Sequence, residues 1–205
     1  MTKHLLVSIL FLVGLSANAL SDSHHPTPKS FKVSEIAPGF HLLQGKGGNI
    51  LVSEGDDGLL VVDADYLEMS EALIKTLDSF KKEVKYLVNT HWHGDHTLGN
   101  KELGKFVDIL AHENVYKRLS TRQEVKLFNK VSEPYPDYAL PDITYENEIS
   151  VHINGDTAQI LHLPGGHTDG DSIVLFEAAN IIHMRDAFRI PYSPYSRVRL
   201  HGRGR

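Results

Sequence analysis

Residues 90–96, THWHGDH, are the part of this sequence that decides its interpretation. They follow an apolar segment, 84–88, that is typical of a buried strand. Four possible metal ligands fall within six residues of this motif: His91, His93, Asp95 and His96. A helix would spread these side chains around its circumference, whereas a loop leaving a strand end can turn them inward together, and Gly94 permits the tight path. The motif therefore predicts a metal site at the rim of a sheet.

Composition limits the chemistry of this site. The chain has 205 residues, 13 His and no Cys, which excludes a disulfide framework, a Cys-type zinc finger and a Cys nucleophile. Imidazole and carboxylate ligands without thiolate suit zinc, iron or manganese better than copper(I). A net charge of -5 argues against a nucleic-acid binder that works through an overall basic field. The hydrophobic content of 41% with 23% charged residues is typical of a soluble globular protein, and the length fits one domain.

The pattern along the chain predicts an α/β protein, with helices packed outside one sheet or two. A turn-rich segment, 54–58, predicts a hairpin between two apolar runs. Apolar residues recur at helical spacing over 67–80, and a second helix is expected at 113–119. Residues 126–141 are expected to form an extended loop. The expected strands are 33–35, 40–43, 49–53, 59–63, 84–88, 107–111, 149–153, 159–163, 172–176 and 181–183.

Two later segments carry further candidate ligands. His167 lies in a turn, 163–172, between two strand-like runs, and the three glycines of this turn let the backbone pass close to a metal. Asp186 ends a strand-like segment, 181–186. Taken alone, Asp186 would be better explained as a turn residue at a strand end. Its interpretation as a ligand therefore depends on the two other motifs.

The three segments, in this order, resemble the metallo-beta-lactamase superfamily over residues 31–188. The resemblance implies an αββα sandwich, here with an incomplete second half, and a pair of metal ions at one edge. It assigns His91, His93 and His167 to the first metal, Asp95 and His96 to the second, and Asp186 to a bridge between both. This ligand set is more similar to the glyoxalase-II-type branches than to lactamases that use a Cys ligand. Asp63 matches an acidic position that orients a ligand His, although a turn residue at a strand end explains it equally well.

The resemblance implies a hydrolase, with two zinc ions per chain and with iron or manganese as alternatives. Two cations lower the pKa of a bridging water to about 7, and the resulting hydroxide attacks a carbonyl or phosphoryl centre. Asp95 is the expected catalytic residue, because it can orient the nucleophile and pass a proton on. We expect a small-molecule substrate, first an acyl compound such as a lactam, lactone or thioester, and no nucleic acid. The alternatives are an iron-dependent oxidoreductase of the same fold and an inactive metal-binding fragment. No oligomeric state is predicted.

The first residues predict export. Lys3 precedes an apolar run, 5–15, and the small-residue sequence Ala-Asn-Ala follows at 17–19, as in a secretory signal peptide. The run is too short for a comfortable membrane span. We therefore expect a signal peptide at 1–19, a linker at 20–30, a periplasmic or secreted protein, and no stable membrane anchor once the signal is removed.

The last residues differ from the rest in composition. Six Arg and no Lys occur from Arg185 onward, whereas two Arg and 13 Lys precede it. The superfamily pattern continues for another helix and strand and supplies a last His ligand, which this sequence lacks. We expect residues 189–205 to be a non-native or disordered basic tail of a truncated or frame-shifted product, with a weak second metal site and reduced turnover. A genuine basic tail that binds anionic surfaces is the alternative.

Overall fold

The computed structural model describes residues 30–125 and 130–184 of the chain. Several predictions concern residues outside these ranges: the signal peptide at 1–19, nearly all of the linker at 20–30, Asp186, and the tail at 189–205. Within the described ranges, no helix is long and apolar enough to cross a membrane.

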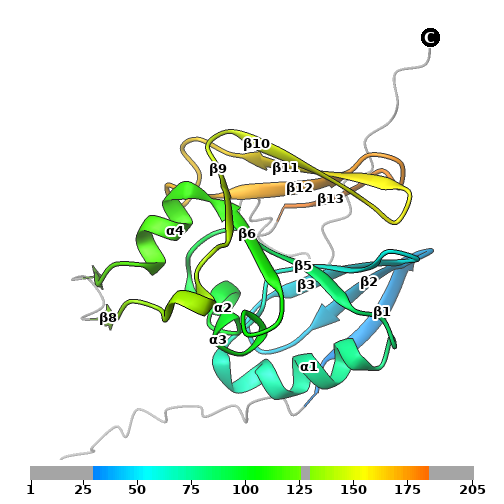
Figure 1. Ribbon diagram of the computed structural model, residues 1–205, viewed down its shortest axis with the longest axis horizontal. Coiled ribbons are helices and arrows are strands. Elements are labelled where there is room, and N and C mark those ends of the chain that lie inside the picture. The colour runs from blue at the N-terminus through cyan, green and yellow to red at the C-terminus, as the bar shows by residue number, and fades with distance from the viewer. Residues whose placement is uncertain (1–29, 126–129, 185–205) are drawn as a thin grey trace, which may run out of the picture.

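Two sheets form the body of the protein (Figure 1). The larger has seven strands in the order β1-β2-β3-β4-β5-β6-β9, and the smaller has four in the order β10-β11-β12-β13. The larger sheet consists of β1 (Lys32–Ala37), β2 (Phe40–Gln44), β3 (Asn49–Gly55), β4 (Gly58–Val62), β5 (Val84–Asn89), β6 (Asp108–His112) and β9 (Ile143–Tyr145). The smaller consists of β10 (Glu148–Ile153), β11 (Asp156–His162), β12 (Ser172–Phe176) and β13 (Ile181–His183). Strands β4, β5, β6 and β9 are parallel, so their carboxyl ends meet at one edge of the sheet.

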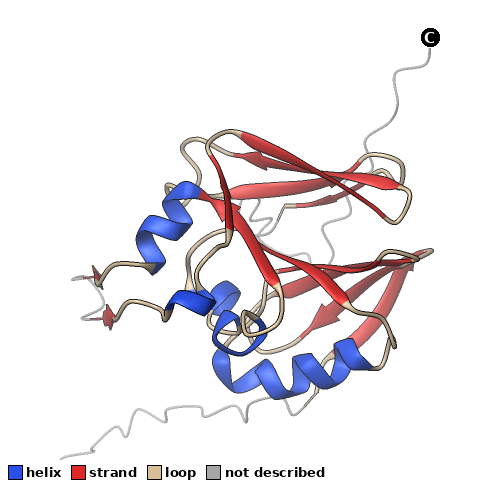
Figure 2. Cartoon of the chain, in the orientation of Figure 1, coloured by secondary structure: helices blue, strands red, loops and turns tan. Residues whose placement is uncertain are grey.

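The helices are short and lie mainly beside the larger sheet (Figure 2). They are α1 (Ser70–Asp78), which follows the 3-10 turn η1 (Leu67–Met69), α2 (Gly94–Thr97), α3 (Asn100–Leu103) and α4 (Glu113–Leu119), with a second 3-10 turn, η3 (Asp137–Ala139). The hairpin at 54–58 and the helix at 113–119 form as predicted. The predicted helix over 67–80 is present as η1 and α1.

Strand β4 shows why the chain folds in layers. All five of its residues are buried, because both of its faces are covered. Leu59 and Val61 join the core under α1, while Leu60 and Val62 face the core between the two sheets. Successive side chains of a strand point to opposite faces, so one apolar strand supplies both cores. The predicted α/β fold with stacked sheets is confirmed.

Several details differ from the sequence-based expectation, among them the short helix α3, which was not predicted. The predicted loop at 126–141 contains β8 (Lys130–Ser132), which pairs with β7 (Gln123–Val125), and the turn η3. Strand β9 was not predicted, because its three residues are too few to show a period, and it forms through parallel pairing with β6. Helix α2 begins inside the 90–96 motif, which was expected to be a loop throughout.

Candidate metal centre

The two His-bearing segments meet at the carboxyl edge of the parallel strands. The first follows β5, and the second is the turn between β11 and β12. Their backbones are joined where Ser172 N donates to Thr90 O over 2.8 Å. One ring nitrogen from each of His91, His93 and His167 lies within 4.8 Å of the others, and His167 Nε2 is 3.1 Å from His93 Nδ1. The fold thus brings together residues more than 70 positions apart in a cluster that can hold a metal ion.

The buried carboxylate of Asp63 supports the first segment. This residue follows β4 with a φ of 69°, and it is 1% exposed. It accepts hydrogen bonds from Thr90 N over 2.8 Å and from His96 Nδ1 over 2.8 Å, and His183 Nε2 lies 3.8 Å away. Burial opposes ionisation, but the charges and hydrogen bonds of His96 and His183 hold the pKa of Asp63 well below its usual range. Asp63 was expected either to orient a ligand histidine or to be a turn residue at a strand end. Its hydrogen bond with His96 is the orienting contact that the resemblance implied.

The hydrogen bonds around Thr90 determine the proton position on His91. Thr90 Oγ1 lies 3.0 and 2.9 Å from the two oxygens of Asp63, which can only accept, so the hydroxyl donates its proton to them. The hydroxyl oxygen is then left to accept from His91 Nδ1 over 3.2 Å. His91 Nε2 consequently carries the lone pair, and it is buried with no hydrogen-bond partner among the described residues. Burial, followed by the charge of His96, lowers the pKa of His91 to about 3.

A neutral, buried imidazole with an unused lone pair is the form that binds a metal ion. An unsatisfied buried polar atom is costly unless a ligand completes it. Because a ring nitrogen of His91 lies close to ring nitrogens of His93 and His167, the donor set fits a divalent cation.

Asp95 and His96 lie together on the single turn of α2. His96 is fully buried, and its Nε2 is 3.3 Å from Asp95 Oδ2, whose side chain is 31% exposed. Burial opposes ionisation of Asp95, but the hydrogen bond and charge of His96 hold the pKa of this carboxyl below its usual range. Asp95 is therefore an ionised group at the rim, beside the cluster. Asp186, the last predicted ligand, lies outside the described residues.

Asp171 is a functional residue that the sequence analysis missed. Its Oδ2 accepts from the backbone N of His167 over 2.7 Å and from Nδ1 of the same residue over 2.8 Å, which leaves His167 Nε2 free of its proton. The burial of Asp171 opposes ionisation, but hydrogen bonds from Thr168 and His167 lower its pKa. A Cβ at Gly166 would lie 2.3 Å from Asp171 Oδ2, so the turn needs glycine there. The only signal was an acidic residue four positions after a candidate ligand.

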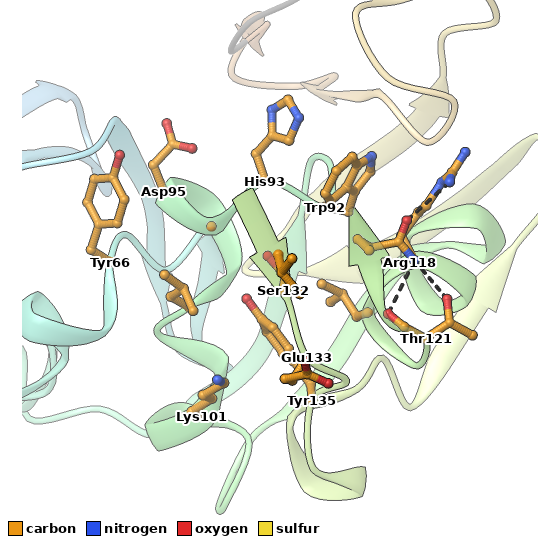
Figure 3. Close-up of a pocket in the computed structure, with 15 residues that line it drawn as sticks. Tyr66, Trp92, His93, Asp95, Lys101, Arg118, Thr121, Ser132, Glu133 and Tyr135 are labelled. Carbon is orange, nitrogen blue, oxygen red and sulfur yellow. Dashed lines mark hydrogen bonds between the residues drawn. The ribbon is translucent and has the colours of Figure 1, made fainter. Parts of the chain in front are cut away.

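A pocket of about 510 Å³ opens beside the cluster (Figure 3). His93 and Asp95 line it on one side, together with Trp92. The Trp92 ring lies against His93, at 4.6 Å between ring centroids. Trp92 also packs on the small apolar core around Val115, so it both lines the pocket and supports the loop. The remaining lining residues are Tyr66, Gly94, Leu98, Lys101, Arg118, Leu119, Thr121, Gln123, Val131, Ser132, Glu133 and Tyr135.

A comparison with known protein families shows which family this chain belongs to. The family described as the Metallo-beta-lactamase superfamily matches residues 43–198. The chain belongs to this superfamily. The match extends past residue 188, where the predicted domain ends. The resemblance drawn from the three motifs is thereby confirmed.

Curated relatives agree with this assignment, and a solved metallo-beta-lactamase structure shares the fold. An atrochrysone carboxyl ACP thioesterase of Claviceps purpurea is 29% identical over 77% of this chain and 44% of its own length. The lactamase-like protein nscB of Arthroderma gypseum is 30% identical over 82% of this chain and 48% of its own. A metallo-beta-lactamase of Cronobacter sakazakii has a TM-score of 0.67 at 16% identity, over 80% of this chain and 66% of that one. The chain thus spans less than half the length of these two curated relatives.

Proposed function

We propose that this member of the superfamily is a zinc-dependent hydrolase of small acyl compounds such as lactams, lactones or thioesters. One observation carries the proposal: His91, whose buried Nε2 has no hydrogen-bond partner among the described residues, has a ring nitrogen within 4.8 Å of nitrogens of His93 and His167. A structural role would not leave a desolvated acceptor unused beside two further imidazoles. The name of one relative, a thioesterase, supports the choice of acyl substrates.

The residues divide into two groups of ligands in this proposal. His91, His93 and His167 would hold the first ion, and Asp95 and His96 would hold the second, with Asp186 between both. When bound, the ions would supply Lewis acidity, which polarises a carbonyl and makes water acidic near neutral pH. Iron or manganese would suit the same imidazole and carboxylate donors.

The protein's own groups orient the reaction. Asp95 is ionised and faces the pocket, so it can accept a hydrogen bond from a water there and take its proton as the water attacks the acyl carbon. Asp63 and Asp171 accept from the Nδ1–H groups of His96 and His167, which keeps the Nε2 atoms of both rings turned to the centre. Trp92 lines one side of the pocket.

Metal analysis combined with a substrate panel tests the proposal. The purified chain would be loaded with zinc, iron or manganese, its metal content measured by mass spectrometry, and hydrolysis followed on a lactam, a lactone, a thioester and a phosphoester. We expect zinc to bind and to support acyl hydrolysis, and His91→Ala to remove both. His152→Ala removes an exposed imidazole on β10 and should change neither. Hydrolysis by no metal-loaded form, or equal activity of His91→Ala, would refute the proposal.

Export is a further part of the proposal. The Lys3 start, the apolar run at 5–15 and the sequence Ala-Asn-Ala at 17–19 support it. Expression of the full chain in a bacterial host should yield a processed protein that begins at Leu20. Amino-terminal sequencing that finds Met1 on protein retained in the cytoplasm would contradict export.

A further inference from the structure

We propose that the pocket beside the metal centre binds an aromatic acyl group that carries a negative charge, with Trp92 as the stacking surface and Lys101 as the counter-ion. This inference rests on the proposed function, because it names the substrate class of the same site. It is carried by the pocket's walls, by the pairing of its charged groups and by the place of Lys101 within it.

Apolar atoms form most of the pocket's lining surface. Tyr66, Trp92 and Tyr135 supply rings, and Leu98 and Leu119 supply aliphatic surface. Trp92 is half-buried and fixed from behind by the core around Val115, so the orientation of its ring is set before a ligand arrives. A rigid indole offers a flat surface on which another aromatic ring gains more than an aliphatic chain of equal area. The volume is also within the range of about 300–1,000 Å³ that small-molecule sites occupy.

Among the described residues that line the pocket, one cation has no carboxylate partner. Arg118 is paired with Asp169 through Nη2 over 2.8 Å. Lys101 has no carboxylate within ion-pair distance among the described residues, and its Nζ lies 4.7 Å from the centroid of the Tyr135 ring. An ammonium group whose partner is an aromatic ring is stabilised only partly, so an anion that enters the pocket gains a nearby partner.

The two acidic residues among the described lining of the pocket, Asp95 and Glu133, are already engaged. Asp95 Oδ2 is 3.3 Å from His96 Nε2, and Glu133 Oε1 is 3.5 Å from Arg122 Nε. Neither carboxylate therefore neutralises Lys101. The pocket thus combines aromatic side chains with an ammonium group that can pair with an anion, which favours an aromatic acid derivative over a neutral or cationic one.

The position of Lys101 indicates where on the substrate the charge lies. Figure 3 shows Lys101 well separated from His93 and Asp95, across the pocket. Its aromatic platform is rigid, because Tyr135 Oη and Thr97 Oγ1 are hydrogen-bonded over 3.0 Å, and Thr97 Oγ1 donates to His93 O over 3.0 Å. The charged substituent should therefore lie at the end of the acyl group remote from the carbonyl that is attacked.

The single tryptophan of the chain gives a direct test. Its indole N–H provides one cross-peak in a ¹⁵N-correlation spectrum, and Trp92 lies in the pocket. The zinc-loaded full chain would be titrated with 2-naphthalenesulfonate, with neutral 2-naphthyl methyl sulfone, and with cyclohexanesulfonate, which is charged but not aromatic. We expect the indole peak to shift and naphthalenesulfonate to bind about tenfold more tightly than either of the others, the size of one partly buried ion pair or one ring contact.

Two lysines form a matched pair of variants. Lys101→Met should reduce the affinity for naphthalenesulfonate to that for the sulfone, and Lys101→Arg should retain most of the preference. Lys105→Met removes the same charge from an exposed position outside the pocket, where Lys105 pairs with Glu102, and should leave the affinities unchanged. Equal binding of sulfonate and sulfone to the wild type, or an equal loss in Lys101→Met and Lys105→Met with unchanged far-ultraviolet circular dichroism, would overturn the inference.

The outcomes separate this inference from the proposed function. If binding depends on Lys101 but no metal-loaded form hydrolyses an acyl substrate, the pocket assignment stands and the hydrolase proposal fails. If acyl hydrolysis is found while the three probes bind equally, the hydrolase proposal stands and the aromatic, anionic substrate class is wrong.

Discussion

The two sides of the metal centre are built in different ways. His91 and His96, on the segment after β5, are buried and share the support of one carboxylate, Asp63, directly or through Thr90. His167, on the turn of the smaller sheet, has a side chain that is 33% exposed and depends on Asp171 within the same turn. The first side is part of the core, whereas the second is a local turn set against it. Folding and ligand placement should therefore be coupled on the first side and separable on the second.

Asp63→Asn should have the largest effect, because it breaks the shared support of the first side. Asparagine tolerates the φ of 69° but loses the charge that the His96 and Thr90 donors require. Removing one partner of a buried charged network costs about 3–5 kcal/mol. Urea unfolding should show a loss in that range, together with weaker zinc binding. A variant with normal stability and weak zinc binding would show that the first side is as separable as the second.

The second-largest effect should be a loss of stability at low pH, which comes from the first side of the metal centre. The unfolded chain protonates His91 near its ordinary pKa of 6.5, whereas in the fold this pKa is lowered to about 3. Between these values the unfolded state binds the additional proton, so the stability of the metal-free protein falls as the pH is lowered through this window, by at most about 1.4 kcal/mol per pH unit. The lowered pKa of Asp63 acts in the same direction below its ordinary value of 3.8.

The variant His91→Gln isolates this contribution. It should flatten the dependence of unfolding free energy on pH between pH 4 and 6.5, whatever its effect on stability at pH 7. The measurement is a series of urea titrations in the presence of a chelator. Parallel curves for the variant and the wild type would mean that His91 does not carry the acid sensitivity.

Asp171→Asn tests whether ligand placement on the second side can be lost without a large loss of stability. The change removes the charge that holds His167 Nδ1–H, and losing such a partner of a ligand His reduces metal affinity about ten- to hundredfold. Because Asp171 acts within its own turn, the free energy of unfolding should fall by less than in Asp63→Asn. Zinc titration and urea unfolding of Asp63→Asn and Asp171→Asn give a zinc affinity and an unfolding free energy for each variant. Equal destabilisation of the two would remove the distinction between core and turn.

The sequence identified residues that are close together along the chain. The 90–96 motif indicated its ligands because four possible metal-binding side chains come after one apolar strand. His167 was predicted from its place in a glycine-rich turn between strands. Asp63 was left between two roles, since nothing local shows that its carboxylate reaches a histidine 33 positions away. His183 had no predicted direction, although it lies 3.8 Å from Asp63. The Asp63–His96 contact depends on the parallel pairing of β4 with β5, and the approach of His183 depends on how the two sheets stack. No single segment encodes either arrangement.

The missed elements have the same cause. Strand β9 and helices α2 and α3 are three or four residues long, so they carry no measurable period and depend on their neighbours. Lys101 on α3 was not singled out, because a lysine in a polar segment is usually a solvated surface residue. Only the fold shows that it faces a pocket and lies over the ring of Tyr135.

The smallest predicted effect concerns the hairpin ends of the two sheets. Asn154, between β10 and β11 with a φ of 56°, exchanges hydrogen bonds with Asp57 of the β3–β4 hairpin: Asn154 N donates to Asp57 Oδ2 over 2.7 Å, and Asp57 N donates to Asn154 Oδ1 over 3.1 Å. Asn154→Gly keeps the backbone conformation accessible and should cost about 1 kcal/mol in urea unfolding, the net value of such side-chain bonds. Zinc affinity should stay unchanged, because Asp171 positions His167 from within its own turn. Weaker zinc binding would instead mean that the second side depends on how the whole smaller sheet is placed, and the two sides would then differ only in degree.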